Sequence, residues 1–184
     1  MKRSFLLFTL ALVFAIGCSK EKKKKRAGFL PNSVIKSRIA KTTEALEELN
    51  KIYISSGWYF SAPRVEKGTG KKIPCQFPTN QDWTPAGSPC DHPDEKYPHN
   101  PEIWTTPTWG SLAFQINDSH YFRYKYESSG EVENARFTVT AAADLDCDGT
   151  WSTFTRVGYA DKNTTHWECS IASLEQMPPV SKDN

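Results

Sequence analysis

The sequence lacks several features that would place it in a well-defined class. It contains no internal repeat of useful length, which argues against an array of repeated structural units. Its longest apolar run, from Phe5 to Ile16, is too short to span a bilayer comfortably. It also has no nucleophile-elbow motif and no zinc-binding helix motif, and scattered Asp, Glu and His residues do not make an active site. These absences favour a single non-enzymatic domain, with an exported hydrolase as the weakest alternative.

The first 17 residues have the pattern of a secretory signal, because a basic start precedes the apolar run. The run ends in Ala15-Ile16-Gly17-Cys18, which resembles the lipobox of bacterial lipoproteins. That resemblance implies cleavage before Cys18 and a covalent lipid on its sulfur, with acyl chains such as palmitate holding the protein to a membrane. A cysteine that stands there by chance is the alternative. The residue after the cysteine is Ser19 and not an aspartate. By resemblance to the sorting of known lipoproteins, this favours the outer membrane over the inner one.

Basic residues are scarce beyond residue 26. The charged stretch from Lys20 to Arg26 is typical of a solvated tether, and it can also lie against anionic lipid headgroups. Residues 27–184 contain 15 Lys and Arg against 20 Asp and Glu, although the whole chain has a formal charge of +2. The folded part is therefore acidic, which argues against nucleic acid as a partner.

A long helical periodicity occurs between Pro31 and Phe60, where large or neutral residues recur at alternating spacings of four and three. We expect Asn32 to cap this helix and the rest of the chain to fold against it; a surface helix on a larger core is the alternative. The expected buried face consists of Ile35, Ile39, Thr42, Leu46, Leu49, Tyr53, Ser56 and Phe60. The expected solvent face consists of Lys36, Arg38, Lys41, Glu44, Glu47, Glu48 and Lys51.

Proline is concentrated in the middle of the chain, since residues 61–108 hold nine of the 12 prolines. A loop of this length in a compact domain usually carries function or is fixed in place. Trp83, Trp104 and Trp109 could present an aromatic binding surface to a partner. The alternative is that they anchor the irregular loop to its own sheet.

Four segments have the composition of β-strands, namely residues 111–117, 120–127, 135–143 and 150–159. In the second, Phe122, Tyr124 and Tyr126 alternate with polar or half-polar neighbours, which is the period of a half-buried strand. Short turns between consecutive strands predict an antiparallel meander. The expected fold class is therefore α+β, with one long N-terminal amphipathic helix packed on an antiparallel sheet of about four strands and a long proline-rich loop between them.

Three aspartates occupy alternate positions before a glycine between the last two expected strands, at Asp144, Asp146, Asp148 and Gly149. This is the spacing of a calcium loop, in which Thr150 would offer its carbonyl and Ser152 a hydroxyl or a bound water. The bidentate glutamate of an EF-hand is missing, so the ligand set needs a further oxygen from elsewhere. An Asp-rich turn without metal is the alternative. Repulsion among three carboxylates favours a bound Ca²⁺.

Apart from Cys18, four cysteines remain, at positions 75, 90, 147 and 169. Their number fits two disulfides in an oxidising compartment, and three pairings are possible. We expect Cys75–Cys90 and Cys147–Cys169, because neighbours in sequence need the simplest topology.

Several stretches resemble type IV pilins. Residues 31–36 (PNSVIK), 40–45 (AKTTEA) and 50–53 (NKIY) are similar to the second half of the long pilin helix. Residues 110–114, 121–124, 137–141 and 144–150 resemble the sheet of pilins from the myxobacterial and related groups. The resemblance covers most of residues 29–177. It implies a pilin-like fold without enzymatic activity, associated with type IV pili or a related secretion system.

The chain differs from pilins just before the helix. Gly28-Phe29 looks like the pilin cleavage site, but Leu30-Pro31-Asn32-Ser33 follows it where a pilin has a long apolar segment and a glutamate. We therefore expect a signal peptide (1–17), a lipid-anchored basic tether (18–28), a pilin-like domain (29–177) and a C-terminal tail (178–184). The expected function is that of a lipid-anchored binding or structural protein of the bacterial cell envelope. A surface adhesin or carbohydrate-binding lipoprotein that uses the Trp-rich loop is the alternative.

Overall fold

The computed structural model describes residues 32–166 and 168–171. All the described residues belong to one of the two units into which the chain divides, Pro31–Asn184. The expected signal peptide, Cys18, the tether and the tail all lie outside the described residues. No helix within the described ranges is long and apolar enough to cross a membrane.

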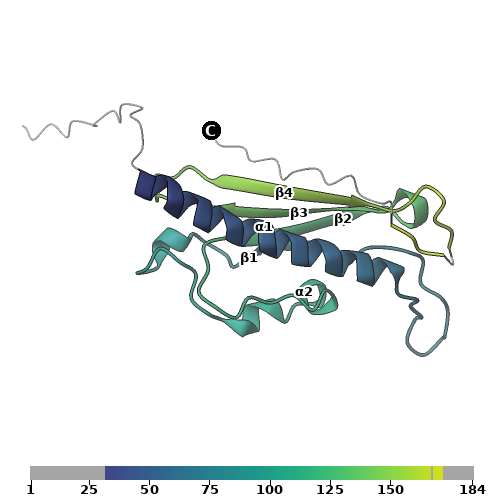
Figure 1. Ribbon diagram of the computed structural model, residues 1–184. Coiled ribbons are helices and arrows are strands. Elements are labelled where there is room, and N and C mark those ends of the chain that lie inside the picture. Colours follow the sequence, from purple (N-terminus) through teal and green to yellow (C-terminus); the bar gives the residue numbers. More distant parts are fainter. Residues whose placement is uncertain (1–31, 167, 172–184) are drawn as a thin grey trace, which may run out of the picture. The chain divides into compact units, whose positions relative to one another are not determined.

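A helix packed on a four-stranded antiparallel sheet forms the frame of the domain (Figure 1). Helix α1 (Asn32–Ser61) lies along one face of the sheet. The strands are β1 (Gln81–Thr84), β2 (Arg123–Ser129), β3 (Arg136–Ala143) and β4 (Ser152–Tyr159), and they pair in that order. The long connection from β1 to β2 contains only short helices, namely η1 (Pro89–Asp91), η2 (Pro101–Trp104) and α2 (Pro107–Ser111), and η3 (Val132–Asn134) joins β2 to β3. The α+β class is thus confirmed.

The face that helix α1 turns to the sheet agrees only in part with the face that the spacing predicts. The residues with at most 1% exposure are Ala45, Leu49, Ile52, Ser56 and Phe60. Leu49, Ser56 and Phe60 belong to the predicted face, but Ile39 and Leu46 are 60% and 38% exposed, so the prediction is wrong for these two. The alternating spacing of large residues fits two neighbouring faces of the helix equally well. The helix packs on the sheet through the face that contains Ala45, whose small side chain allows a close approach but does not stand out in a pattern of large residues.

Aromatic rings fill the space between α1 and the sheet. The ring of Phe77 lies between those of Phe60 and Phe137, with centroid distances of 4.5 and 4.7 Å. Phe137 also stacks on Tyr126 at 5.4 Å, and the Tyr126 hydroxyl lies 3.1 Å from Ser56 Oγ inside the helix–sheet interface. Stacked rings of this kind add to the free energy gained from burying their area.

Three of the four predicted strands are confirmed, and one is replaced. The segments predicted at 120–127, 135–143 and 150–159 contain most or all of β2, β3 and β4. The segment 111–117 is not a strand, because its alternating Leu112, Phe114 and Ile116 pack individually into the core from an irregular chain. The remaining strand is β1, a four-residue piece of the proline-rich loop that has too few residues for a recognisable alternation.

Both predicted disulfide pairs are wrong, although all four cysteines form disulfides. Cys75 bonds to Cys169 and Cys90 to Cys147, with Cα–Cα distances of 5.5 and 5.7 Å. The cause is topological, since the chain after β4 turns back and Ile171 pairs with Ala160, which brings Cys169 to Cys75. Helix η1 in turn places Cys90 beside the turn between β3 and β4, where Cys147 lies.

The packing of Phe137 requires a glycine on the neighbouring strand. Gly158 faces Phe137 across β3 and β4, and a Cβ at position 158 would overlap the Phe137 ring. We therefore expect Gly158→Ala to lower the free energy of unfolding by about 1–3 kcal/mol in urea denaturation.

Gly110→Ala is the matched control, because a Cβ there meets no atom within 4 Å. It should change stability by less than about 1 kcal/mol. Equal stability of the Gly158→Ala variant and the wild type would contradict the tight packing of β4 against Phe137.

Candidate functional site

The turn between β3 and β4 gathers three carboxylates, as the sequence predicts. One oxygen from each of Asp144, Asp146 and Asp148 lies within 4.8 Å of the others. Asp144 follows directly on β3 and is only 6% exposed, whereas Asp146 and Asp148 are exposed. One acidic group of the cluster is therefore part of the protein interior and the other two face solvent.

Four contacts fix the backbone of this turn. The Asp144 carboxylate accepts hydrogen bonds from the backbone N–H groups of Asp148 and Gly149, at 3.2 and 2.8 Å. Gly149 has a φ of 89°, which favours glycine. Lys41 on α1 donates from Nζ to the Leu145 carbonyl at 3.0 Å, and the Cys90–Cys147 disulfide attaches the turn to the proline-rich loop. The turn is thus fixed by two hydrogen bonds within it and by one polar and one covalent contact from outside it.

The donor set suits a hard divalent cation. Carboxylate oxygens are the ligands that calcium prefers, and each oxygen of Asp144 keeps a second lone pair after accepting its backbone hydrogen bond. The other two predicted ligands are Thr150 and Ser152. The Thr150 N–H donates to Asp148 Oδ1 at 2.9 Å, and Ser152 is the first residue of β4, opposite Ala143. Ca²⁺ takes six to eight oxygens, so the three aspartates would need carbonyls or water to complete the coordination.

The predicted aromatic surface does not form from all three tryptophans. Trp104 and Trp109 are 2% and 0% exposed, and Trp109 donates from Nε1 to Thr84 Oγ1 at 2.9 Å. Both rings contact Phe114 at 5.3 Å, so they anchor the proline-rich loop on the sheet. Trp83 is half-buried, and the Arg123 guanidinium lies 4.5 Å from its ring centroid and 3.7 Å from that of Trp151. The prediction of a binding surface is wrong for Trp104 and Trp109.

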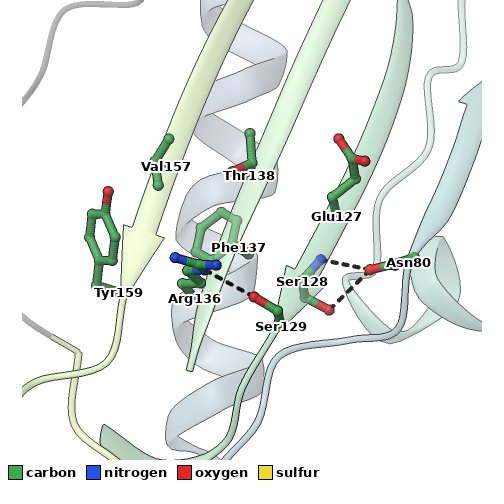
Figure 2. Close-up of a pocket in the computed structure, with 9 residues that line it drawn as sticks. All are labelled: Asn80, Glu127, Ser128, Ser129, Arg136, Phe137, Thr138, Val157 and Tyr159. Atoms are coloured by element: carbon green, nitrogen blue, oxygen red, sulfur yellow. Dashed lines mark hydrogen bonds between the residues drawn. The ribbon is translucent and has the colours of Figure 1, made fainter. Parts of the chain in front are cut away.

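A groove of about 510 Å³ lies on the face of the sheet that α1 leaves open (Figure 2). Strands β2, β3 and β4 contribute Glu127, Arg136 and Tyr159 to its wall, and Asn80 closes one side. Its two serine hydroxyls have hydrogen-bond partners, because Arg136 Nε donates to Ser129 Oγ at 3.0 Å and the Ser128 hydroxyl donates to the Pro78 carbonyl. Neither contact pairs a serine with a base, so the groove offers hydrogen-bonding groups rather than an activated nucleophile.

Glu44 is half-buried and hydrogen-bonded to the chain before β2, although the helical pattern predicts it on the solvent face. Its Oε1 accepts hydrogen bonds from the backbone N–H groups of Tyr121 and Phe122, at 2.9 and 3.2 Å. Burial raises the pKa of Glu44 above its ordinary value of 4.5, and this effect exceeds the lowering by the two hydrogen bonds. The buried hydroxyl of Tyr124 also has a raised pKa, first because of burial and then because of the charges of Glu44 and Glu48. No sequence pattern marks this role, since Glu44 stands in a charged stretch of the helix.

The chain matches no protein-family model, no curated protein and no solved structure.

The half-buried carboxyl of Glu44 should make stability depend on pH in a defined direction. Because folding raises its pKa, the stability that protonated Glu44 contributes is complete below pH 4.5 and is lost as pH rises through the pKa of the folded state. Glu44→Gln keeps an oxygen acceptor and removes the charge, so we expect this variant to gain stability relative to the wild type as pH increases from 4 to about 7. Urea denaturation at each pH measures the difference.

Glu47→Gln is the matched control, since Glu47 is exposed on the same helix. Glu44→Ala removes the acceptor of two backbone N–H groups and should cost about 1–3 kcal/mol. Parallel stability curves for the wild type and Glu44→Gln over the whole pH range would contradict the burial of this carboxylate.

Proposed function

We propose that this chain is a non-enzymatic lipoprotein of the bacterial cell envelope. In this proposal, acyl chains on Cys18 hold it to a membrane, the outer membrane in preference to the inner one. Residues 29–177 then form a pilin-like head that binds or supports envelope components such as type IV pili or a related secretion system. The observation that carries the proposal is the pair of disulfides, Cys75–Cys169 and Cys90–Cys147.

Disulfides persist in oxidising compartments and are rare where glutathione keeps thiols reduced. The two bonds use every cysteine except Cys18, which leaves the lipobox-like cysteine as the one candidate for acylation. The cysteine arrangement therefore agrees with the secretory pattern of residues 1–17, although the two observations are independent.

A pilin-like head is supported by the arrangement of the frame. Helix α1 comes first, the irregular loop follows, and an antiparallel sheet receives one face of the helix.

The exposed side of α1 bears Ile54 and Trp58, which are 49% and 76% exposed. The sheet does not cover all apolar residues of α1, since Ile39 and Leu46 are exposed as well. Burial of the helix by its own sheet is therefore no argument against assembly into a fibre. The absence of a long apolar segment after Cys18 remains the basis for expecting an anchored relative of pilins rather than a fibre subunit.

Within this proposal, the turn at Asp144, Asp146 and Asp148 binds calcium as a structural ion. Its carboxylates converge, and the turn is fastened by Lys41 and by the Cys90–Cys147 bond. A bound cation would relieve the repulsion among the three carboxylates and stiffen the connection between β3 and β4. The adhesin alternative receives less support, because two of its three tryptophans are core residues.

The anchoring proposal is tested by changing the lipidated cysteine in the full chain and fractionating its native cells. The wild type should sediment with membranes, and Cys18→Ala should not acquire the lipid and should leave the membrane fraction. Ser19→Ala is the control and should stay with the membranes. Wild-type protein found in the soluble fraction would contradict anchoring, and recovery as a stoichiometric subunit of sheared fibres would show a true pilin.

Calcium binding is tested by the melting temperature of the disulfide-bonded protein in calcium and in chelator. Because the ion would bind the folded state, stability should increase by about 2.7 kcal/mol when calcium is present at 100 times its Kd. Asp146→Ala should abolish the increase, whereas Asp94→Ala, an exposed aspartate in the proline-rich loop, should retain it. A melting temperature that is the same with calcium and with chelator would exclude the site.

A further inference from the structure

The turn that follows β4 carries an acceptor sequence for N-linked glycosylation. Its residues are Asp161-Lys162-Asn163-Thr164-Thr165, and Asn163 and Thr165 satisfy the Asn-x-Thr pattern. Asn163, Thr165 and the neighbouring Lys162 are exposed. An acceptor of this kind must lie on an accessible surface loop of an exported protein, and this turn meets the structural part of that requirement.

The two ends of the turn are fixed, and Asn163 lies at its tip. The Asp161 N–H donates to the Ser170 carbonyl at 2.8 Å, and the buried Thr164 donates from Oγ1 to the same carbonyl at 2.8 Å. Asp161 Oδ1 accepts a hydrogen bond from the Asn163 N–H at 2.8 Å, which bends the chain at the acceptor. The hydroxyl of Thr165, two residues after the acceptor, accepts a hydrogen bond from the Glu168 N–H at 3.1 Å. Asn163 and Thr165 are both exposed, so an enzyme can reach them.

A second Asn-x-Ser/Thr sequence, Asn117-Asp118-Ser119, provides an internal comparison. Asn117 is also exposed, but its Oδ1 accepts a hydrogen bond from Gln115 Nε2 at 2.9 Å. Gln115 also stands two residues before this asparagine, where the first sequence has the carboxylate of Asp161. The negative charge two residues before Asn163 gives a transferase a cation-binding contact that the Asn117 sequence lacks.

We propose that Asn163 is an N-glycosylation site and that Asn117 is not. This inference goes beyond the envelope function but requires the export on which that function rests. The donor is a lipid-linked oligosaccharide pyrophosphate. The Asn163 carboxamide nitrogen bonds to C1 of the first sugar while the bond from C1 to the pyrophosphate oxygen breaks. The lipid pyrophosphate leaves with that electron pair, and the amide gives up one proton to a base of the transferase.

The position of the turn allows the addition without disturbing the fold. The tip lies beyond the end of β4, and the hydrogen bonds that fix the turn come from Asp161, Thr164 and Thr165 rather than from the side chain of Asn163. An oligosaccharide on Asn163 would project from exposed residues. It would also lie close in sequence to Cys169, whose disulfide ties this return segment to Cys75.

The test uses full-length protein extracted from the membranes of its native cells and digested with trypsin. Cleavage after Arg123 puts the two acceptor sequences on different peptides. The peptide that contains Asn163 should carry an added oligosaccharide mass, and the peptide that contains Asn117 should not. Asn163→Gln and Thr165→Ala should each remove the added mass, whereas Thr165→Ser, which keeps the hydroxyl, and Asn117→Gln should retain it.

Membrane-bound protein whose Asn163 peptide has only the unmodified mass would overturn this inference and leave the envelope proposal standing. Unmodified protein recovered from the cytoplasm would overturn both. Added mass that survives Asn163→Gln would place the modification elsewhere and would also overturn the assignment. Melting temperatures of the variants, measured in parallel, show whether each is folded.

Discussion

Two covalent bonds determine how the irregular half of this domain sits on its regular half. Cys90–Cys147 joins the proline-rich loop to the turn between β3 and β4, and Cys75–Cys169 joins the beginning of that loop to the segment that returns after β4. These bonds link residues 57 and 94 positions apart. In the chain-entropy model, closures of that length destabilise the unfolded chain by roughly 4–5 kcal/mol each. Without them, the loop would be held by non-covalent contacts alone, namely hydrogen bonds and packing.

The packing that the disulfides support is aromatic. Trp104, Trp109 and Phe114 enter the core from the loop, and Trp104 and Phe114 meet the ring of Tyr124 on β2. On the other side of the core, the ring of Phe77 lies between Phe60 of α1 and Phe137 of β3. Phe77 belongs to the proline-rich loop, where it precedes β1. The loop therefore supplies part of the layer between helix and sheet, and its length does not imply mobility.

The sequence predicts the elements better than it predicts their contacts. The 3.6-residue period of α1 and the alternation of β2 depend on neighbours along the chain, so both are visible before folding. The buried face of α1 depends on Ala45 and Ile52 meeting the sheet, and a small residue leaves little trace in a pattern of large ones. The convergence of Asp144, Asp146 and Asp148 is local and was predictable. The burial of Glu44 is not local, because its partners are the N–H groups of Tyr121 and Phe122.

Cysteine pairing shows the same limit most clearly. The expectation of Cys75–Cys90 and Cys147–Cys169 assumes that nearby cysteines pair, but the observed partners are chosen by the way the loop and the return segment cross the sheet. Four cysteines allow three pairings, and only the tertiary fold selects among them.

Peptide mapping of the non-reduced protein, purified from an oxidising compartment, tests this arrangement most directly. The fold requires a peptide that contains Cys75 linked to one that contains Cys169, and a peptide that contains Cys90 linked to one that contains Cys147. Recovery of Cys75 linked to Cys90, with Cys147 linked to Cys169, would show that the loop and the return segment do not cross as described.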